Sequence, residues 1–471
     1  MKTPKIILSL SLVYAVTGYA LEQDVVVVND PVQNTPIDAQ ATLGEDNESN
    51  TLFITKTSAT EPAAVKSNKV INLNDVISDT IAYPAILSAE ADVNASHGEK
   101  RAADMQRYPT LSVSSSTSGT AIISPILQIQ QPLWTGGKIT GQIEEAEHLV
   151  ESAEAKKETT TYIIALKAVT AWQNLIDSQN SIQINEEILG DLNNYREFMD
   201  RRVAAGVSPQ IELQLILTRI EQVLADIQSA KATHQVAKIQ IKQLTNYGYS
   251  DPELDSTPTL ESQVILAKKW LETKLTNDPS NFLADTAAEY PAVLQAQKDV
   301  EVLKARYKIK KAAYYPTISV GYQYIVNGGN SNFNNSNDGR FTLGISYQPG
   351  AGLSSYESAK AAQIRAEGAQ NAIDAAKLDI LESMNADIQD ALSNQQREDL
   401  LSTSVEASSM VLESYKRQFI AGKRSWFDVL NALRELTQNK LAVVHTKTSL
   451  ISSTYKLMVK SGEFKQYNNG L

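Results

Sequence analysis

The 471-residue sequence contains no cysteine, and only 7% of its residues are aromatic. The lack of cysteine excludes disulfide scaffolds, thiolate metal sites and cysteine nucleophiles, and it suits an oxidising compartment in which free thiols react. After the N-terminal segment, no apolar run approaches the ~20 residues that a transmembrane helix requires. The net charge of −11 argues against a nucleic-acid partner, because phosphate binding needs an excess of clustered lysine and arginine.

Catalytic and cofactor motifs are also missing. The sequence contains no Gly-x-Ser-x-Gly, Walker or dinucleotide-binding motif. The four histidines form no ligand pattern, so we expect them to be exposed on helix surfaces: His97, His148, His234 and His445. We therefore predict a protein that is not an enzyme and that binds no metal or cofactor.

The N-terminal segment has the features of an export signal. Two lysines precede the apolar run 6–16, and glycine and alanine at positions 18 and 20 fit a signal-peptidase site. A short N-terminal helix is the alternative. Residues 21–68 are rich in Asn, Thr, Asp, Ala and Pro with little periodicity, which is typical of a disordered arm. Export without an apolar helical anchor leaves secretion, a periplasmic location or a β-barrel in an outer membrane.

The rest of the sequence contains one unit twice. The motif Tyr83-Pro84-Ala85 recurs as Tyr290-Pro291-Ala292, and Tyr108-Pro109-Thr110 recurs as Tyr315-Pro316-Thr317, both about 207 residues later. Because the spacing inside each copy is the same, we infer that one structural unit was duplicated. We expect a signal peptide at 1–20, a disordered arm at 21–68, a first repeat at 69–246, an equatorial connection at 247–288, a second repeat at 289–462 and a tail at 463–471.

Each repeat contains a segment typical of a very long helix. Residues 142–205 and 353–421 have one glycine each and no proline, so each predicts a helix about 100 Å long. Apolar residues recur at steps of three and four, which favours antiparallel coiled-coil packing. The returning helices are expected at 211–244 and 427–459, after hairpin tips at 203–209 and 419–426.

Short alternating segments predict strands at about 110–117, 122–134, 316–326 and 340–348. In the second repeat every other residue is apolar, as in strands with lipid on one face and an aqueous lumen on the other. A soluble hairpin packed on a helix has the same pattern and is the alternative. The residues expected to face lipid are Ile318, Val320, Tyr322, Tyr324, Phe341, Leu343, Ile345 and Tyr347.

Four strands are too few to close a membrane barrel, since the smallest such barrels have about eight. An open sheet edge cannot exist in lipid, so other copies of the chain must complete the sheet. Three copies would supply about twelve strands and leave an open pore. The strands therefore predict a homotrimer embedded in outer-membrane lipid.

The chain resembles the TolC family of outer-membrane efflux and secretion channels over about residues 70–462. The resemblance rests on the duplicated helix-strand-strand-helix order, on the motif Gln131–Lys138 before a long helix, and on the tip Phe419–Ala432. It implies a mostly α-helical fold with a small membrane β-barrel: a trimeric twelve-stranded barrel, a mixed equatorial region and a long helical tunnel in the periplasm. It also implies two partners, a periplasmic adaptor and an inner-membrane pump, either an ABC exporter or a proton-driven pump.

The resemblance assigns the second tip to the periplasmic gate. Arg424 matches an arginine that ties neighbouring helices together, and Asp428 matches an aspartate ring at the constriction. Two positions depart from the family pattern: Phe419 replaces a tyrosine and loses its hydroxyl, and Asn431 replaces a second aspartate. Independently of the family, three Asp428 carboxylates in a narrow pore would make a negative throat. Ordinary solvated hairpin residues are the alternative.

The resemblance also assigns both tips to the contact with the adaptor. Termination of a helix by glycine explains the same loops, and both explanations can hold together. The loop residues concerned are Ala205, Gly206, Val207, Ala421, Gly422 and Lys423.

Two features of the sequence bear on the substrate. Without a cysteine the chain lacks the lipid attachment point of the drug-efflux branch, and the long N-terminal arm resembles that of channels exporting large adhesins, so we favour type I protein secretion. Multidrug or small-molecule efflux through the same kind of channel is the first alternative. Two other classes stay open, a periplasmic adaptor and a structural coiled-coil protein.

Overall fold

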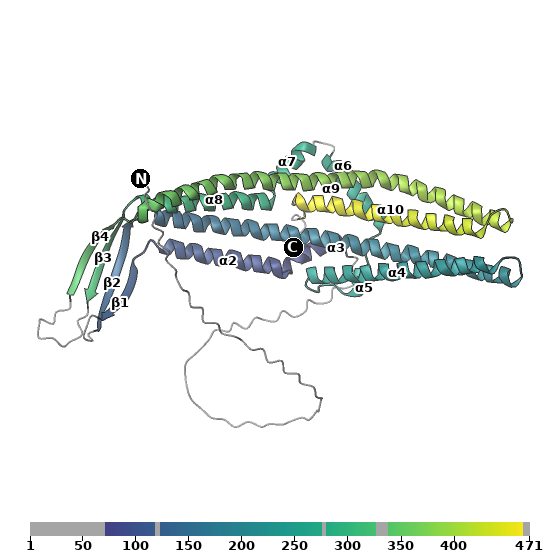
Figure 1. Ribbon diagram of the computed structural model, residues 1–471, viewed down its shortest axis with the longest axis horizontal. Coiled ribbons are helices and arrows are strands. Elements are labelled where there is room, and N and C mark those ends of the chain that lie inside the picture. The colour runs from purple at the N-terminus through teal and green to yellow at the C-terminus, as the bar shows by residue number, and fades with distance from the viewer. Residues whose placement is uncertain (1–70, 118–122, 276–278, 326–337, 465–471) are drawn as a thin grey trace, which may run out of the picture. The chain divides into compact units, whose positions relative to one another are not determined.

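The computed structural model describes residues 71–117, 123–275, 279–325 and 338–464. The chain divides into two compact units, 1–60 and 61–471, and every described residue belongs to the second. Helices make up most of this unit, and four strands form one sheet (Figure 1). The expected fold class, mostly α-helical with a small β component and a duplicated unit, is confirmed.

Both repeats have the same succession of elements. The first contains α1 (Leu73–Asp79), the 3-10 helix η1 (Thr80–Ala82), α2 (Pro84–Met105), β1 (Thr110–Thr117), β2 (Ile123–Trp134), α3 (Lys138–Ala204) and α4 (Gln210–Leu244). Three short helices follow: α5 (Asp251–Leu254), α6 (Leu260–Leu275) and α7 (Pro279–Glu289). The second repeat contains α8 (Pro291–Lys311), η2 (Ala312–Tyr314), β3 (Thr317–Ile325), β4 (Asp338–Ser346), η3 (Ala351–Leu353), α9 (Ser354–Ile420) and α10 (Trp426–Lys460).

The duplication extends to backbone geometry. Helices α3 and α9 each have 67 residues, and α4 and α10 each have 35. Tyr83 caps α2 with φ −68° and ψ 135°, and Tyr290 caps α8 with φ −65° and ψ 133°. A proline follows each tyrosine at the first helical position, where its missing N–H leaves no hydrogen bond unmade. The repeated Tyr-Pro pair therefore starts equivalent helices.

No helix within the described ranges is both long and apolar enough to cross a membrane.

The strands form an antiparallel sheet in the order β1-β2-β3-β4. β3 joins the two repeats, because Ile129 of β2 and Phe341 of β4 both pair with Tyr322. The register between β2 and β3 shifts once, between Pro132 and Trp134. β1 and β4 are left as the two edges of the sheet.

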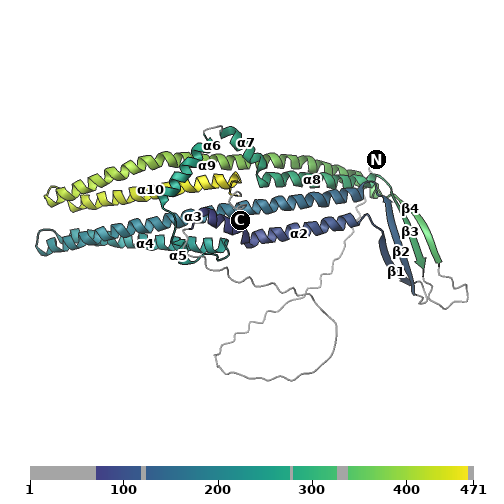
Figure 2. The ribbon, with the colours of Figure 1, turned by 180° about the vertical axis from the view of Figure 1, so that it is seen from behind.

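The sheet lies at one end of the helices and the two hairpin tips lie at the other (Figures 1 and 2). Helices α2, α3, α8 and α9 run beside one another toward the sheet, whereas the pairs α3–α4 and α9–α10 run to the tips. One apolar core, including Trp172 and Leu450, joins helices of both repeats in the equatorial region. A second core, including Met199 and Val429, joins the two hairpins near their tips. The described part of the equatorial connection contains helices α5, α6 and α7 joined by irregular segments.

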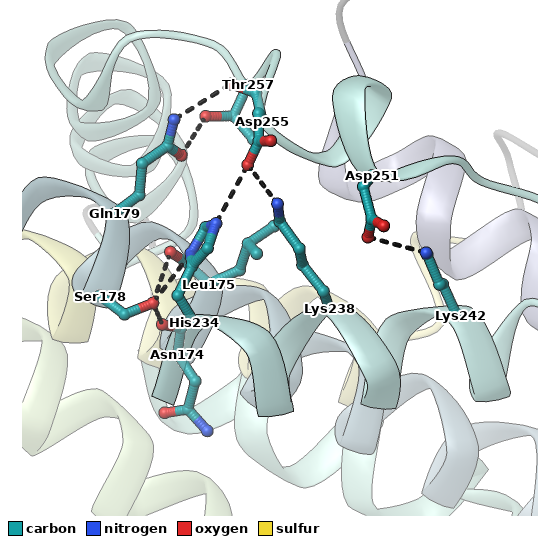
Figure 3. Close-up of polar contacts among 10 residues, drawn as sticks. All are labelled: Asn174, Leu175, Ser178, Gln179, His234, Lys238, Lys242, Asp251, Asp255 and Thr257. Atoms are coloured by element: carbon teal, nitrogen blue, oxygen red, sulfur yellow. Dashed lines mark hydrogen bonds and ion pairs between the residues drawn. The ribbon is translucent and has the colours of Figure 1, made fainter. Parts of the chain in front are cut away.

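A polar cluster attaches the segment after α5 to the first hairpin (Figure 3). His234 of α4 lies between Ser178 and Asp255, with its Nδ1 3.2 Å from the Ser178 Oγ and its Nε2 3.1 Å from the Asp255 Oδ1. The Lys238 Nζ lies 2.6 Å from the same Oδ1. Burial raises the pKa of Asp255, but the hydrogen bonds from Lys238 and His234 outweigh this and hold the pKa below its usual value.

This cluster corrects one expectation. The His234 side chain is only 12% exposed, so the prediction that all four histidines are exposed on helix surfaces is wrong for this residue. The partners of His234 come from α3 and from the segment after α5, 56 and 21 positions away in the sequence. A local pattern around the histidine therefore contains no signal of its burial.

Candidate functional site

The first candidate surface is the apolar face of the sheet. Seven of the eight residues expected to face lipid lie on this one face, because alternate residues of a strand point to the same side and the register aligns β3 with β4. The eighth, Tyr347, lies one residue beyond the end of β4. Phe341 is the most open of them at 81% exposure, and Leu343, Ile345, Tyr347 and Tyr322 are exposed as well. Ile318, Val320 and Tyr324 are half-buried. The first repeat extends the face with Leu111, Val113, Leu127 and Ile129.

The opposite face of the sheet is mostly polar, with the cross-strand pair Ile126 and Ile325 as its apolar exception. The Gln130 amide donates to the Ser319 hydroxyl across 2.9 Å. The Arg340 guanidinium donates twice to the Gln323 side-chain oxygen, at 3.0 and 2.8 Å. These are cross-strand pairs, and the Arg340 partner is neutral, so the charge of Arg340 is not compensated by it. The two faces of one sheet thus have opposite chemistry, which is what a wall between lipid and water requires.

The first hairpin tip ends α3 with a left-handed glycine. Gly206 has a φ of +72°, and its N–H donates to the Val203 carbonyl across 2.9 Å. The Val207 N–H donates to the Arg202 carbonyl, also across 2.9 Å. These two bonds form a Schellman motif. Ala205 is the C-cap of α3, and the motif requires a positive φ at the residue that follows the cap, which here is Gly206. Ala205, Gly206 and Val207 are all exposed.

The second tip repeats this geometry at the end of α9. Gly422 has a φ of +71°, and its N–H donates to the Phe419 carbonyl across 2.9 Å. The Lys423 N–H donates to the Gln418 carbonyl across 2.8 Å. Ala421, Gly422 and Lys423 are exposed. The structure thus presents two equivalent exposed turns at the same end of the molecule.

Arg424 and Asp428 come together just after this turn. Asp428 is part of a capping box: its Oδ2 accepts from the Ser425 N–H at 3.2 Å and from the Ser425 hydroxyl at 2.8 Å. The Arg424 NH1 lies 3.9 Å from the same carboxylate oxygen, and its guanidinium lies over the Tyr415 ring at 4.4 Å. The side-chain and backbone hydrogen bonds from Ser425 lower the pKa of Asp428, and the Arg424 charge adds to the effect. Asp428 therefore remains ionised near neutral pH.

Phe419 and Asn431 are placed differently from this pair. Phe419 is 6% exposed and packs on Trp426 and Phe198, with ring centroids 5.0 and 6.3 Å away. The Arg202 guanidinium covers the same ring at 5.1 Å. Phe419 therefore joins the first hairpin to the second inside one chain. Asn431 lies one turn beyond Asp428 on α10 and is half-buried.

The aromatic cluster at the tips was not predicted from the sequence. Trp426 contacts Phe419 on one side and Tyr195 on the other, with the Tyr195 centroid 5.4 Å away. A signal was present: in a chain with few aromatic residues, Tyr195 and Phe198 lie shortly before the first tip, and Phe419 and Trp426 flank the second. Aromatic residues near both tips indicate that the tips pack together.

Comparison with known proteins gives a family and a fold. The chain matches the family model described as outer membrane efflux protein over residues 81–247 and 283–463. A search of curated proteins gives no match. The outer membrane protein VceC from Vibrio cholerae has a similar structure with a TM-score of 0.68 at 16% identity, covering 83% of this chain and 96% of VceC.

Two further solved structures are similar. The CmeC outer membrane channel of Campylobacter jejuni has a TM-score of 0.68 at 13% identity and covers 90% of this chain and 94% of its own. The open state of the MtrE outer membrane channel of Neisseria gonorrhoeae has a TM-score of 0.62 at 15% identity, covering 83% of this chain and 88% of its own.

Proposed function

This chain belongs to the outer membrane efflux protein family, and we propose that it is a channel-tunnel through which substrates pass passively from a periplasmic and inner-membrane machinery to the exterior. Its place is the outer membrane, with the helical part forming a tunnel in the periplasm. We assign it no catalytic step, so the energy for transport comes from the pump with which it works.

The proposal rests above all on the two-faced sheet with unpaired edges. In the order β1-β2-β3-β4, neighbouring strands alternate in direction, so β4 of one copy can pair with β1 of the next and keep the alternation. Such pairing removes the edges, which lipid does not tolerate. Two copies would give a barrel of about eight strands filled by side chains, whereas three give about twelve and an open lumen. We therefore propose a homotrimer.

Exposed apolar side chains on the long helices support assembly of the tunnel from several copies. Ile364, Leu378 and Leu392 on α9 are exposed and separated by 14 residues, or two heptads. Residues at heptad spacing lie along one seam of a supercoiled helix. An exposed seam of this kind is a liability in a lone chain, and we propose that the helices of a neighbouring copy cover it.

We propose that the second tip forms the periplasmic throat and that both tips receive the adaptor. Convergence of three Asp428 side chains would place three carboxylates around the axis, with Arg424 beside each. Phe419 and Asn431 complete the proposed gate, Phe419 by fixing the second hairpin to the first. For the adaptor we propose the exposed turns at Ala205–Val207 and Ala421–Lys423, which have the same backbone geometry and so can receive two equivalent partner segments.

As substrate we propose a protein exported by type I secretion, such as a large adhesin, with an ABC exporter as the pump. The support is from sequence: there is no cysteine for lipid attachment, and the composition of residues 21–68, rich in Asn, Thr, Asp, Ala and Pro, differs from that of the rest of the chain. Deleting the gene tests this. Loss of one large protein from the culture medium supports secretion, whereas increased drug sensitivity with unchanged secreted proteins assigns the channel to small-molecule efflux with a proton-driven pump.

Reconstitution tests the channel itself. The detergent-extracted protein, added to a planar lipid bilayer, should produce discrete conductance steps, and its mass by light scattering should equal three chains plus detergent. Release of the protein from membranes by salt washing, or a monomeric preparation without conductance, would remove the proposal and favour an adaptor or a structural coiled coil.

A further inference from the structure

A cavity of about 480 Å³ lies where the helices meet the sheet. Thr317 of β3 and Ser346 of β4 line it, and these two residues are cross-strand partners. They alternate with Ile318 and Ile345 of the apolar face, so the cavity opens on the polar face of the sheet. In the proposed trimer this is the face that lines the lumen.

The charged residues of this surface are predominantly cationic. Lys138, the first residue of α3, and Lys310, in the last turn of α8, line the cavity. A second cavity of about 310 Å³ shares Lys310 and extends along α9 to Arg365. Lys138, Lys310 and Arg365 have no ion-pair partner among the described residues; we call these three the basic collar.

The neighbouring charges do not neutralise the basic collar. Glu145 lines the second cavity but is paired with Arg306, whose Nε lies 2.6 Å from the Glu145 carboxylate. Arg340, on the same polar face of the sheet, is bonded only to the neutral Gln323 within the described ranges. Uncompensated cations thus gather on one surface of a chain whose net charge is −11.

One residue that lines the first cavity has an unsatisfied hydroxyl. Ser355 lines the cavity, and its hydroxyl, which is closed to solvent behind the cavity surface, has no hydrogen-bond partner in the part of the chain that the structure describes. A buried hydroxyl without a partner costs free energy unless a ligand or water satisfies it. Hydroxyl donors beside ammonium and guanidinium groups are the chemistry that binds carboxylate or phosphate oxygens.

We propose that the basic collar is an anion-binding station of the conduit, and that the transported substrates present clustered carboxylate or phosphate groups. This inference rests on the proposed channel function, because the collar faces the lumen only in the assembled barrel. In the trimer it contributes nine cationic side chains, three from each chain, at the barrel end, whereas Asp428 places negative charge at the other end. A charged ring inside a low-dielectric wall concentrates counter-ions and thereby selects substrates by charge.

Single-channel recording tests this with two defined anions, tripolyphosphate and citrate, added on the strand side of the bilayer. Block by either anion should require about tenfold more ligand in the triple variant Lys138→Gln/Lys310→Gln/Arg365→Gln, the lower end of the effect of charge focusing. The charge-conserving triple variant Lys138→Arg/Lys310→Arg/Arg365→Lys should be blocked like the wild type. The control is Lys360→Gln, an exposed lysine of α9 that lines neither cavity, and its block should not change.

The outcomes separate the collar from the channel. If no variant or wild-type protein conducts, the channel proposal itself has failed. If all conduct and the neutral triple variant is blocked as strongly as the wild type, the channel stands and the collar is wrong. Block by tripolyphosphate but not by citrate assigns the collar to phosphate groups, and block by both assigns it to multivalent anions in general.

Discussion

Neutralising Asp428 without removing its side chain tests the proposed throat. Alanine at this position would remove the charge and also the two hydrogen bonds that the carboxylate accepts from the Ser425 N–H and hydroxyl at the start of α10. Asparagine keeps an oxygen that can accept from the Ser425 N–H, now 3.2 Å from the carboxylate, and removes only the charge. Asp428→Asn is therefore the informative change.

The size of the effect follows from the charges. A trivalent cation on the axis, roughly 10 Å from each of three carboxylates, gains about 1.2 kcal/mol from each in bulk water, or about 3.7 kcal/mol in total. Screening at ~0.1 M salt, with a Debye length of about 10 Å, reduces this to about 1.4 kcal/mol, which is roughly tenfold in affinity. We expect Asp428→Asn to weaken block of single-channel current by hexaamminecobalt(III), added on the hairpin side, by about this factor.

The control for this measurement is Glu99→Gln on α2, an exposed carboxylate in the helices that run toward the sheet. Hexaamminecobalt(III) should block the single-channel current of Glu99→Gln as strongly as that of the wild type. Equal block of wild type and Asp428→Asn would refute the reasoning, because it would mean that the Asp428 carboxylates do not converge on the pore.

Three further predictions concern stability and pH. Lys460→Met should destabilise the detergent-solubilised protein by about 3–5 kcal/mol in chemical unfolding, because it leaves the buried Asp387 carboxylate, 2.6 Å from the lysine, without its partner. The double variant Asp387→Leu/Lys460→Met should recover most of this loss of stability. No recovery would contradict the explanation. Gly422→Ala should lower the free energy of unfolding by about 1 kcal/mol, because the φ of Gly422 is +71°. Ala421→Ser is the control, and an equal loss of unfolding free energy in the two variants would argue against strain at the turn. The lowered pKa of Asp255 adds stability that is present above its unfolded pKa of ~3.9 and is lost as the pH falls through its folded pKa. The hydrogen-exchange protection factors of α5, which are corrected for the intrinsic rate at each pH, should therefore fall between about pH 5 and pH 3, and constant protection factors would show that the cluster does not hold this segment.

The parts of the fold that were predictable from sequence depend on local periodicity. The absence of proline from residues 142–205 and 353–421 predicted two long helices, and these helices are α3 and α9. The prediction was possible because helix propensity acts within a few residues. Alternation around Tyr322 predicted which residues share a face of the sheet, because a strand has a period of two. The family expected from these patterns is confirmed by the match to the outer membrane efflux protein model.

The environments of single side chains were not predictable in this way. The family resemblance predicted Phe419 as a gate residue, and nothing in the sequence around it predicted that its ring is covered by Phe198, Trp426 and Arg202. His234 is buried because segments far apart in the sequence meet around it. Both cases depend on how the hairpins and the equatorial segment pack, and this packing has no local pattern in the sequence.

The central claim is that neighbouring copies close the sheet by pairing β4 with β1. The chain has no cysteine, so cysteines introduced at Ser114 in β1 and Thr342 in β4 would be its only thiols. Within one chain two strands separate these edges, a distance of roughly 14 Å that a disulfide cannot span. We predict that oxidation, or a short bismaleimide where the register separates the thiols, yields covalent dimers and trimers in the membrane fraction and nothing larger. Monomers alone, or a ladder that continues past the trimer, would contradict the account.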